Sequence, residues 1–164
     1  MIIKEISNRR SVREYKPDDV TDELIIEIIK AGQFAPSAKN NQAVEFVVVR
    51  KQETKEKIFE IVGQEYVKQA PVLIIPVIDE TKSILPVQDL SVASENMFLQ
   101  AAALGLGTVW KNLRPEWEKG VKKLLAVPEQ FRAVNIIPVG YPKNKIEPHT
   151  NADFNDKKIH REKW

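Results

Sequence analysis

The sequence QDLSVASENMFLQAAAL, residues 88–104, decides the fold because it is a long stretch without glycine or proline. Its apolar side chains cover most of a helical circumference instead of forming one stripe, which is typical of a buried central helix. They are Val92, Ala93, Met97, Leu99, Ala101, Ala102, Ala103 and Leu104. Gly105 and Gly107 follow, and we expect them to end the helix. The small residues near its C-terminal end allow another helix or a second subunit to approach closely.

Predicted strands flank this helix on both sides in the sequence. Residues 44–49 and 131–140 are apolar runs with several β-branched residues, as is typical of buried strands. Residues 71–78 predict a further strand, whose prolines favour an end or an edge of the sheet. Amphipathic helices are predicted over residues 21–32, 53–62 and 115–125. Because strands and helices are mixed without a regular repeat, the sequence predicts an α+β fold with a sheet covered by helices.

Length and composition indicate one soluble domain over residues 1–164. No apolar run approaches the ~20 residues that a membrane helix needs, and the first residues lack the pattern of an export signal. We therefore expect a cytoplasmic protein with no membrane partner. The 25 basic and 23 acidic residues give a net charge of +2, which disfavours nucleic-acid binding.

The sequence contains no cysteine and only two histidines, His149 and His160. The lack of cysteine removes disulfides, thiolate nucleophiles and cysteine-based metal sites. Both histidines lie in the last sixteen residues, so the sequence predicts neither a histidine-rich metal site nor a central Ser-His-Asp relay. If the protein is an enzyme, we expect a bound organic cofactor to carry its chemistry.

A group of cations lies near the N-terminus, in the sequence NRRSVR of residues 8–13. Arginine has a fixed charge and a planar fork of donors that matches phosphate oxygens. Residues 105–107, Gly-Leu-Gly, follow a predicted helix instead of opening one, so a dinucleotide fingerprint is not expected. A phosphate would therefore be held by Arg9, Arg10, Ser11 and Arg13. The alternative is a solvated basic end of the domain.

Two further segments have both an ordinary and a functional interpretation. Residues 36–42, PSAKNNQ, form either a simple turn before a strand or a loop whose amides and hydroxyl contact a heteroaromatic edge. Residues 108–113, TVWKNL, form either a plain strand after the central helix or a strand that passes a cofactor.

Seven short segments follow one another in an informative order. They are RRSVR at 9–13, PSAKNNQ at 36–42, APV at 70–72, ENMFLQAA at 95–102, LGLGTVW at 104–110, VGYP at 139–142 and IHREKW at 159–164. In this order they resemble the nitroreductase family of flavin-dependent oxidoreductases over nearly the whole chain. The resemblance implies a central β-sheet flanked by helices and an intertwined homodimer with two flavin mononucleotide (FMN) sites at the subunit interface.

The resemblance also implies roles for the arginine cluster. Arg9, Arg10 and Ser11 match positions that hold the phosphate and ribityl chain of FMN. Arg13 matches the basic residue beside N1 and the C2 carbonyl of the ring. Reduction places negative charge at that edge, so a fixed cation there favours the reduced flavin.

The remaining positions that the resemblance carries over lie in the loop and in the following strand. The loop that meets the flavin from the partner subunit is matched by Pro36, Ser37, Ala38 and Asn40. The strand whose backbone N–H groups approach N5 and O4 is matched by Val109, Trp110, Lys111, Asn112 and Leu113. Because main-chain donors do not constrain side-chain type, Lys111 and Asn112 are compatible with binding and are candidates for shaping the substrate pocket.

The C-terminal tail, residues 143–164, is expected to extend from the domain and pack on the partner subunit. Members of the family often carry a tail Arg or Lys that reaches the phosphate, whereas the matching stretch here is NADF at residues 151–154. Lys157, Lys158 and Arg161 are the candidates to replace it, and of these Arg161 is included in the expected site. The alternative is a solvated charged tail.

These expectations combine into an NAD(P)H-dependent reductase with no catalytic side chain and no metal. NAD(P)H would deliver a hydride to flavin N5, and a small electron-poor acceptor such as a nitroaromatic or a quinone would then be reduced. The sequence does not distinguish NADH from NADPH. Two alternatives stay open: a different flavin-fold activity, such as reductive dehalogenation or flavin modification, or a flavin-binding protein without turnover.

Overall fold

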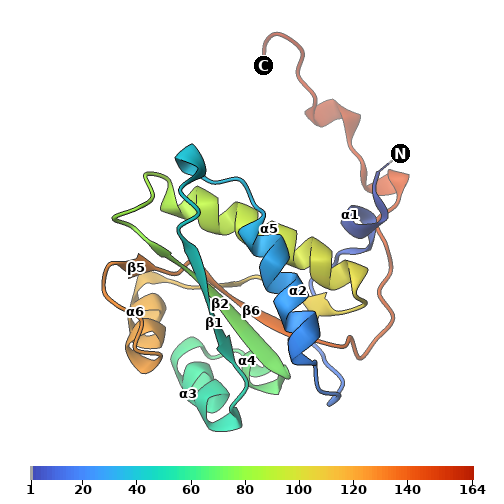
Figure 1. The fold of residues 1–164 in the computed structure, drawn as a ribbon. Coiled ribbons are helices and arrows are strands. Elements are labelled where there is room, and N and C mark those ends of the chain that lie inside the picture. The colour runs from blue at the N-terminus through green and yellow to red at the C-terminus, as the bar shows by residue number, and fades with distance from the viewer. Residues whose placement is uncertain (1) are drawn as a thin grey trace.

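The computed structural model describes residues 2–164, which fold into a sheet covered by helices on both faces (Figure 1). The main strand order is β1 (Val44–Val49), β2 (Val72–Asp79), β6 (Asn135–Gly140) and β3 (Gly107–Thr108). Two short strands complete the sheet: β4 (Lys111–Asn112) pairs with β6, and β5 (Phe131–Arg132) pairs with β2. Each of these pairings is antiparallel.

The helices divide between the two faces of the sheet. On one face lie α2 (Asp22–Gln33) and α5 (Pro86–Ala103), and on the other lie α3 (Gln52–Val62), α4 (Glu65–Gln69) and α6 (Pro115–Leu124). Outside these layers are the short helix α1 (Lys4–Asn8) and the 3₁₀ turns η1 (Ala38–Asn40), η2 (Asn151–Asp153) and η3 (Asp156–Lys158). The α+β class and the covered sheet that the sequence predicted are confirmed.

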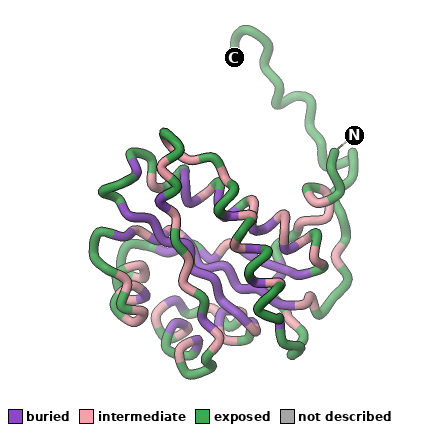
Figure 2. The backbone as a smooth tube through the Cα atoms, in the orientation of Figure 1, coloured by how far each residue is buried: buried purple, intermediate pink, exposed green. Residues whose placement is uncertain are grey.

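Strand β2 is the centre of the core, and all eight of its residues are buried (Figure 2). Val72 and Ile74 pack under α2 and α5, whereas Leu73, Ile75 and Val77 pack against α3, α4 and α6. Successive side chains of a strand point to opposite faces of a sheet, so a continuous apolar run supplies both layers of the core.

The prolines of residues 71–78 predicted an end or an edge; Pro71 does lie directly before the first residue of β2, but the edge position is wrong. β2 lies between β1 on one side and β5 and β6 on the other, and Pro76 sits opposite Phe46 of β1. On its second side β2 pairs with β6 up to Ile74 and with β5 from Ile78 onward. Pro76 falls in the break between these two ladders, which is where a residue without an N–H is tolerated in an internal strand.

The predicted strand of residues 131–140 is divided into β5 and β6. The predicted central helix is confirmed as α5, but its burial is incomplete in the single chain. Leu90, Ala93 and Met97 are fully buried, while Val87 and Val92 are 41% and 39% exposed. One side of this apolar helix therefore has no cover from its own chain.

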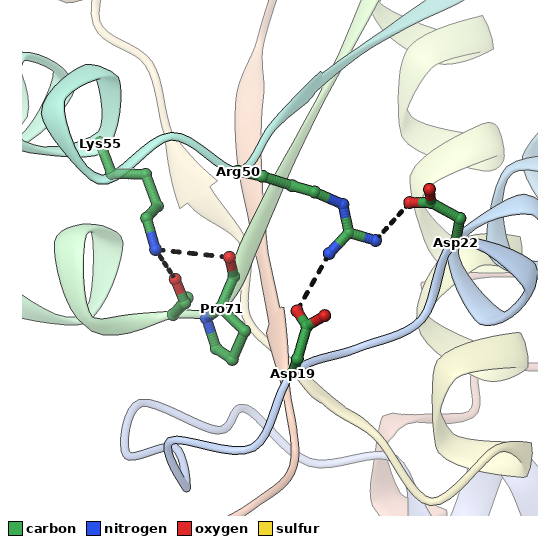
Figure 3. A network of polar contacts seen from close by, with 6 residues as sticks. Asp19, Asp22, Arg50, Lys55 and Pro71 are labelled. Atoms are coloured by element: carbon green, nitrogen blue, oxygen red, sulfur yellow. Dashed lines mark hydrogen bonds and ion pairs between the residues drawn. The ribbon is translucent and has the colours of Figure 1, made fainter.

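Two basic side chains near the start of α3, Arg50 and Lys55, connect this part of the chain to the segments that precede α2 and β2 (Figure 3). Arg50, after β1, contacts Asp19 at 3.2 Å and Asp22, in the first turn of α2, at 2.6 Å. The buried Lys55 of α3 donates to the carbonyls of Ala70 at 2.7 Å and Pro71 at 3.3 Å. These contacts fix where the chain enters α2 and β2.

The chain beyond β6 runs first along the N-terminal segment and then away from the body of the domain (Figures 1 and 2). All residues from 147 to 164 are exposed, including Trp164, which is fully exposed and stacks on His160. The tail of residues 143–164 is thus extended in the single chain. None of the helices within residues 2–164 combines the length and the apolar character needed to cross a bilayer.

We predict that Gly107→Ala destabilises the fold by about 1–3 kcal/mol because an added Cβ overfills the core. A Cβ at this position would lie 2.7 Å from Cβ, Cγ1 and Cγ2 of Val12. Urea unfolding at one fixed protein concentration measures the loss. The double variant with Val12→Ala should cost less than the sum of the two single changes, since loss of Cγ1 and Cγ2 removes two of the three close contacts. Additive costs would contradict this packing argument.

Candidate functional site

The arginine segment, residues 9–13, is held against the sheet by its own backbone. The Val12 N–H donates to the Thr108 carbonyl at 2.9 Å, and Ser11 forms a parallel bridge with Thr108 of β3. Val12 is buried against Gly107, and the absence of a glycine side chain permits this approach. The segment therefore lies at the C-terminal end of α5, where the chain enters β3.

Two cavities lie on either side of Arg10. One, of about 200 Å³, is lined by Arg9, Arg10, Thr108 and the C-terminal half of α5. The other, of about 400 Å³, is lined by residues 10–14 and by the first part of the tail, with Lys145 on its wall. The structure thus places Arg9 at the first cavity, Ser11 and Arg13 at the second, and Arg10 at both.

Arg9 and Arg10 each make one polar contact with other groups of the described chain. Nε of Arg9 lies 3.5 Å from Oε1 of Glu95, and both side chains are partly exposed. Arg10 donates to the Glu147 carbonyl at 3.1 Å. A guanidinium has five N–H donors, so both residues keep donors for an anion.

Lys145 is a candidate site residue that the sequence analysis missed. Backbone hydrogen bonds from Lys16 to the Tyr141 carbonyl and from Lys143 to the Glu14 carbonyl lay the tail beside the arginine segment. This places Lys145 next to Arg10 and Arg13, although it also pairs with Glu147 at 3.0 Å. The sequence alone did not mark it among the several tail lysines.

Two tyrosines, Tyr15 and Tyr66, lie next to the arginine segment. Tyr15 donates its hydroxyl to the Val12 carbonyl at 2.7 Å, and burial raises the pKa of Tyr15 well above its usual value. Burial also raises the pKa of Tyr66, while the adjacent Arg13 guanidinium opposes the increase. Arg13 therefore lies beside the Tyr66 hydroxyl.

The loop of residues 36–42 lies elsewhere in the same chain. Pro36 and Ser37 line a cavity of about 360 Å³ next to Asp89 and Ala93, at the N-terminal end of α5. Asp89 and Ala102 are thirteen helical residues apart, or about 20 Å along the axis. Ala38 and Asn40, within η1, belong to the same loop. One chain therefore does not bring the loop and the arginine segment into one cavity.

Residues 109–113 turn most of their side chains away from the arginine segment. Lys111 lies over the Trp117 ring at 3.8 Å, and Leu113 packs in the core beneath α3 and α6. Burial lowers the pKa of Lys111, assisted by the nearby charge of Arg114. Asn112 is exposed. The two residues suggested for shaping a substrate pocket thus do not line the cavities beside Arg10.

Trp110 packs on the face of the sheet that α2 and α5 cover. Val109 is buried, and the Trp110 ring meets Phe98 of α5 edge to face, with centroids 6.2 Å apart. Arg161 lies in the exposed tail and lines neither cavity of the arginine segment. Within residues 2–164 no group of three or more acidic or histidine side chains could hold a metal ion.

The profile of the Nitroreductase family matches residues 6–68 and 62–141, which together contain both ends of the candidate site. The chain belongs to the nitroreductase family. This membership confirms the resemblance seen in the seven segments, and it makes the protein an oxidoreductase of the nitroreductase type.

Relatives of this chain cover between 88% and 99% of it. A protein of Methanothermobacter thermautotrophicus, provisionally named NADH dehydrogenase/NAD(P)H nitroreductase, is 39% identical across 99% of this chain and 87% of its own. An FMN reductase [NAD(P)H] of Bacillus subtilis is 28% identical across 88% of this chain and 67% of its own. The solved structure of an FMN-dependent nitroreductase from Clostridium difficile R20291 superposes with a TM-score of 0.93 at 31% identity, over 99% of this chain and 100% of that one.

Tyr15→Phe tests whether the buried hydroxyl anchors the arginine segment of this nitroreductase. Free tyrosine loses its proton near pH 10, but buried Tyr15 keeps it, so the unfolded state binds fewer protons above that pH. The stabilising effect of Tyr15 is therefore complete below pH 10 and is lost as the pH rises further. Between pH 10 and 11 we expect the free energy of unfolding of the wild-type protein to fall by about 1 kcal/mol more than that of Tyr15→Phe.

Urea unfolding of both proteins at each pH measures this difference. Parallel pH profiles of the two proteins would show that the Tyr15 hydroxyl titrates normally. The anchoring role would then be wrong.

Proposed function

We propose that this protein is an FMN-dependent NAD(P)H oxidoreductase that reduces small electron-poor acceptors, such as nitroaromatics or quinones, in two half-reactions. The observation that carries the proposal is the arginine segment, which is fixed to β3 with hollows on both sides of Arg10. The names of the Bacillus subtilis and Clostridium difficile relatives support FMN as the cofactor.

The residues present fit a flavin phosphate. Arg9 and Arg10 retain free donors beside a cavity, and Ser11 adds a hydroxyl on the wall of the second cavity. Among the described residues 2–164, only the partly exposed Glu95 pairs with Arg9, so a doubly charged phosphate can compete for this guanidinium. We assign the phosphate and ribityl chain to Arg9, Arg10 and Ser11.

Arg13 is the residue assigned to the ring of the flavin. When bound, FMN supplies the hydride-accepting atom N5. A guanidinium beside N1 and the C2 carbonyl would stabilise the negative charge that reduction places there. The Leu113 N–H donates to the Val134 carbonyl at 2.9 Å, so the backbone N–H groups that would orient the N5 and O4 edge are those within residues 109–112. The buried Lys111 side chain stays free to pack on Trp117.

We further propose that two copies of the chain form each site. The loop residues Pro36, Ser37, Ala38 and Asn40 lie too far along α5 to share a cavity with the arginines of their own chain. A homodimer would bring the loop of one copy to the arginine segment of the other. The apolar side chains that such a dimer could cover include Ile2, Ile3, Ile6, Val87 and Val92. A cytoplasmic location would give this enzyme access to NAD(P)H.

Anaerobic reduction of the FMN-loaded protein tests the activity and the role of Arg13. We expect a yellow protein that NADH or NADPH bleaches. Arg13→Ala should weaken FMN binding by about 10-fold to 100-fold and slow the bleaching, because a charged hydrogen bond contributes about 1.5–3 kcal/mol. Arg114→Ala, which removes a cation over Trp117 instead, should retain the wild-type affinity.

Equal FMN affinity in Arg13→Ala and wild type would remove the role assigned to Arg13. A wild-type preparation that stays colourless after incubation with excess FMN would overturn the proposed function.

Deletion of residues 150–164 tests the contribution of the tail to the dimer. These residues are exposed in the single chain and include Phe154, Ile159 and Trp164. If they cover the partner subunit, the truncated protein should be less stable by a few kcal/mol and should dissociate at higher concentration. Light scattering across a dilution series measures the dissociation. A truncated protein with unchanged mass and stability would contradict the proposal for the tail.

A further inference from the structure

Asp89 is a buried carboxylate, 5% exposed, in the N-terminal half of α5. Its oxygens accept three hydrogen bonds: Oδ1 from the Ala38 N–H at 2.9 Å, and Oδ2 from Ser83 Oγ at 2.6 Å and Asn41 Nδ2 at 3.2 Å. No ion pair within residues 2–164 includes Asp89. The side chain is therefore held by neutral donors, two of which belong to the loop before β1.

That loop has a backbone that needs support. Lys39, Asn40 and Gln42 have φ values of 54°, 54° and 49°, in the left-handed region that residues other than glycine rarely adopt. Two further side-chain contacts close the turn: Ser37 Oγ accepts the Gln42 N–H, and Asn41 Oδ1 accepts the Ala43 N–H. The hydrogen bonds of Asp89 connect this strained turn to helix α5.

We propose that Asp89 is a positioning residue that holds the loop in the conformation with which Ser37, Ala38 and Asn40 meet the flavin of the partner subunit. This role rests on the proposed function. The same helix carries Glu95, which pairs with Arg9, and lines the cavity of the arginine segment. Helix α5 thus fixes one half of the site at each of its ends, and Asp89 makes the connection at the loop end.

Asp89→Asn is the direct test, since it keeps the shape of the side chain but replaces an acceptor oxygen with a donor. Whichever way the amide turns, its NH₂ group faces a donor, either the Ala38 N–H or Asn41 Nδ2. We expect the dissociation constant of FMN, measured by flavin fluorescence, to rise by at least about tenfold.

Asp79→Asn is the matched control. Asp79 is 6% exposed, and its Oδ1 accepts from the N–H and the hydroxyl of Thr81 in its own turn. This variant removes an equally buried carboxylate without touching the loop. Its FMN dissociation constant should stay within about twofold of wild type, even where its melting temperature falls.

A second readout separates positioning from general stability. With FMN at saturation, the visible circular dichroism of the bound flavin reports the surroundings of the ring. We expect it to change in Asp89→Asn and to match wild type in Asp79→Asn. If both variants merely melt at lower temperature and bind FMN as wild type does, the role of Asp89 is overturned.

Ser83→Ala provides the test if Asp89→Asn does not fold. It removes the hydrogen bond to Asp89 from outside the loop and leaves the carboxylate in place. We expect FMN binding to weaken by about twofold to fivefold, and unchanged binding would overturn the proposal. A wild-type protein that binds no FMN would instead overturn the proposed function, and the role of Asp89 with it.

Discussion

The hydrogen bond from the Val12 N–H to the Thr108 carbonyl is the contact on which the candidate site depends. It adds the N-terminal segment to the sheet beside β3, and the missing side chain of Gly107 lets Val12 approach. Without it, three arginines would form a loose basic end of the chain. With it, they occupy a fixed position at one end of α5. Packing there holds the three positive charges close together despite their mutual repulsion, and this concentrated charge can attract an anion.

Helix α5 sets the geometry of everything else in the site. Its N-terminal half anchors the loop of residues 36–42 through Asp89, and its C-terminal half lines the hollow beside Arg9. A straight helix of this length separates the two groups, so a single chain presents two incomplete halves. The exposed side of α5 is apolar at Val87 and Val92, which is the kind of surface that a second copy would cover.

Local sequence patterns predicted the elements well and the neighbours of each element poorly. The apolar periodicity located α5, α3 and β1, because burial of one stripe or one run is a local property. The internal position of β2 was not predictable from Pro76, since it depends on a break between two ladders formed by distant residues. The same holds for Lys145 and Asp89: the first reaches the arginines through the path of the tail, and the second meets a loop 48 to 51 residues away.

Two acidic side chains of α5, Glu95 and Asp89, contact the two halves of the candidate site and differ in how far they are exposed. Glu95 is about half exposed and lies 3.5 Å from Arg9, so this pair contributes at most about 1 kcal/mol and can yield to a phosphate. Asp89 is buried and accepts hydrogen bonds at both oxygens, so separating it from the loop would leave a buried carboxylate with Ser83 as its remaining partner, at a cost of about 1–3 kcal/mol or more. Helix α5 therefore presents an exchangeable carboxylate to the arginine segment and a fixed one to the loop. In the site proposed above, a phosphate would displace Glu95 from Arg9 while the contacts of Asp89 keep the loop in place.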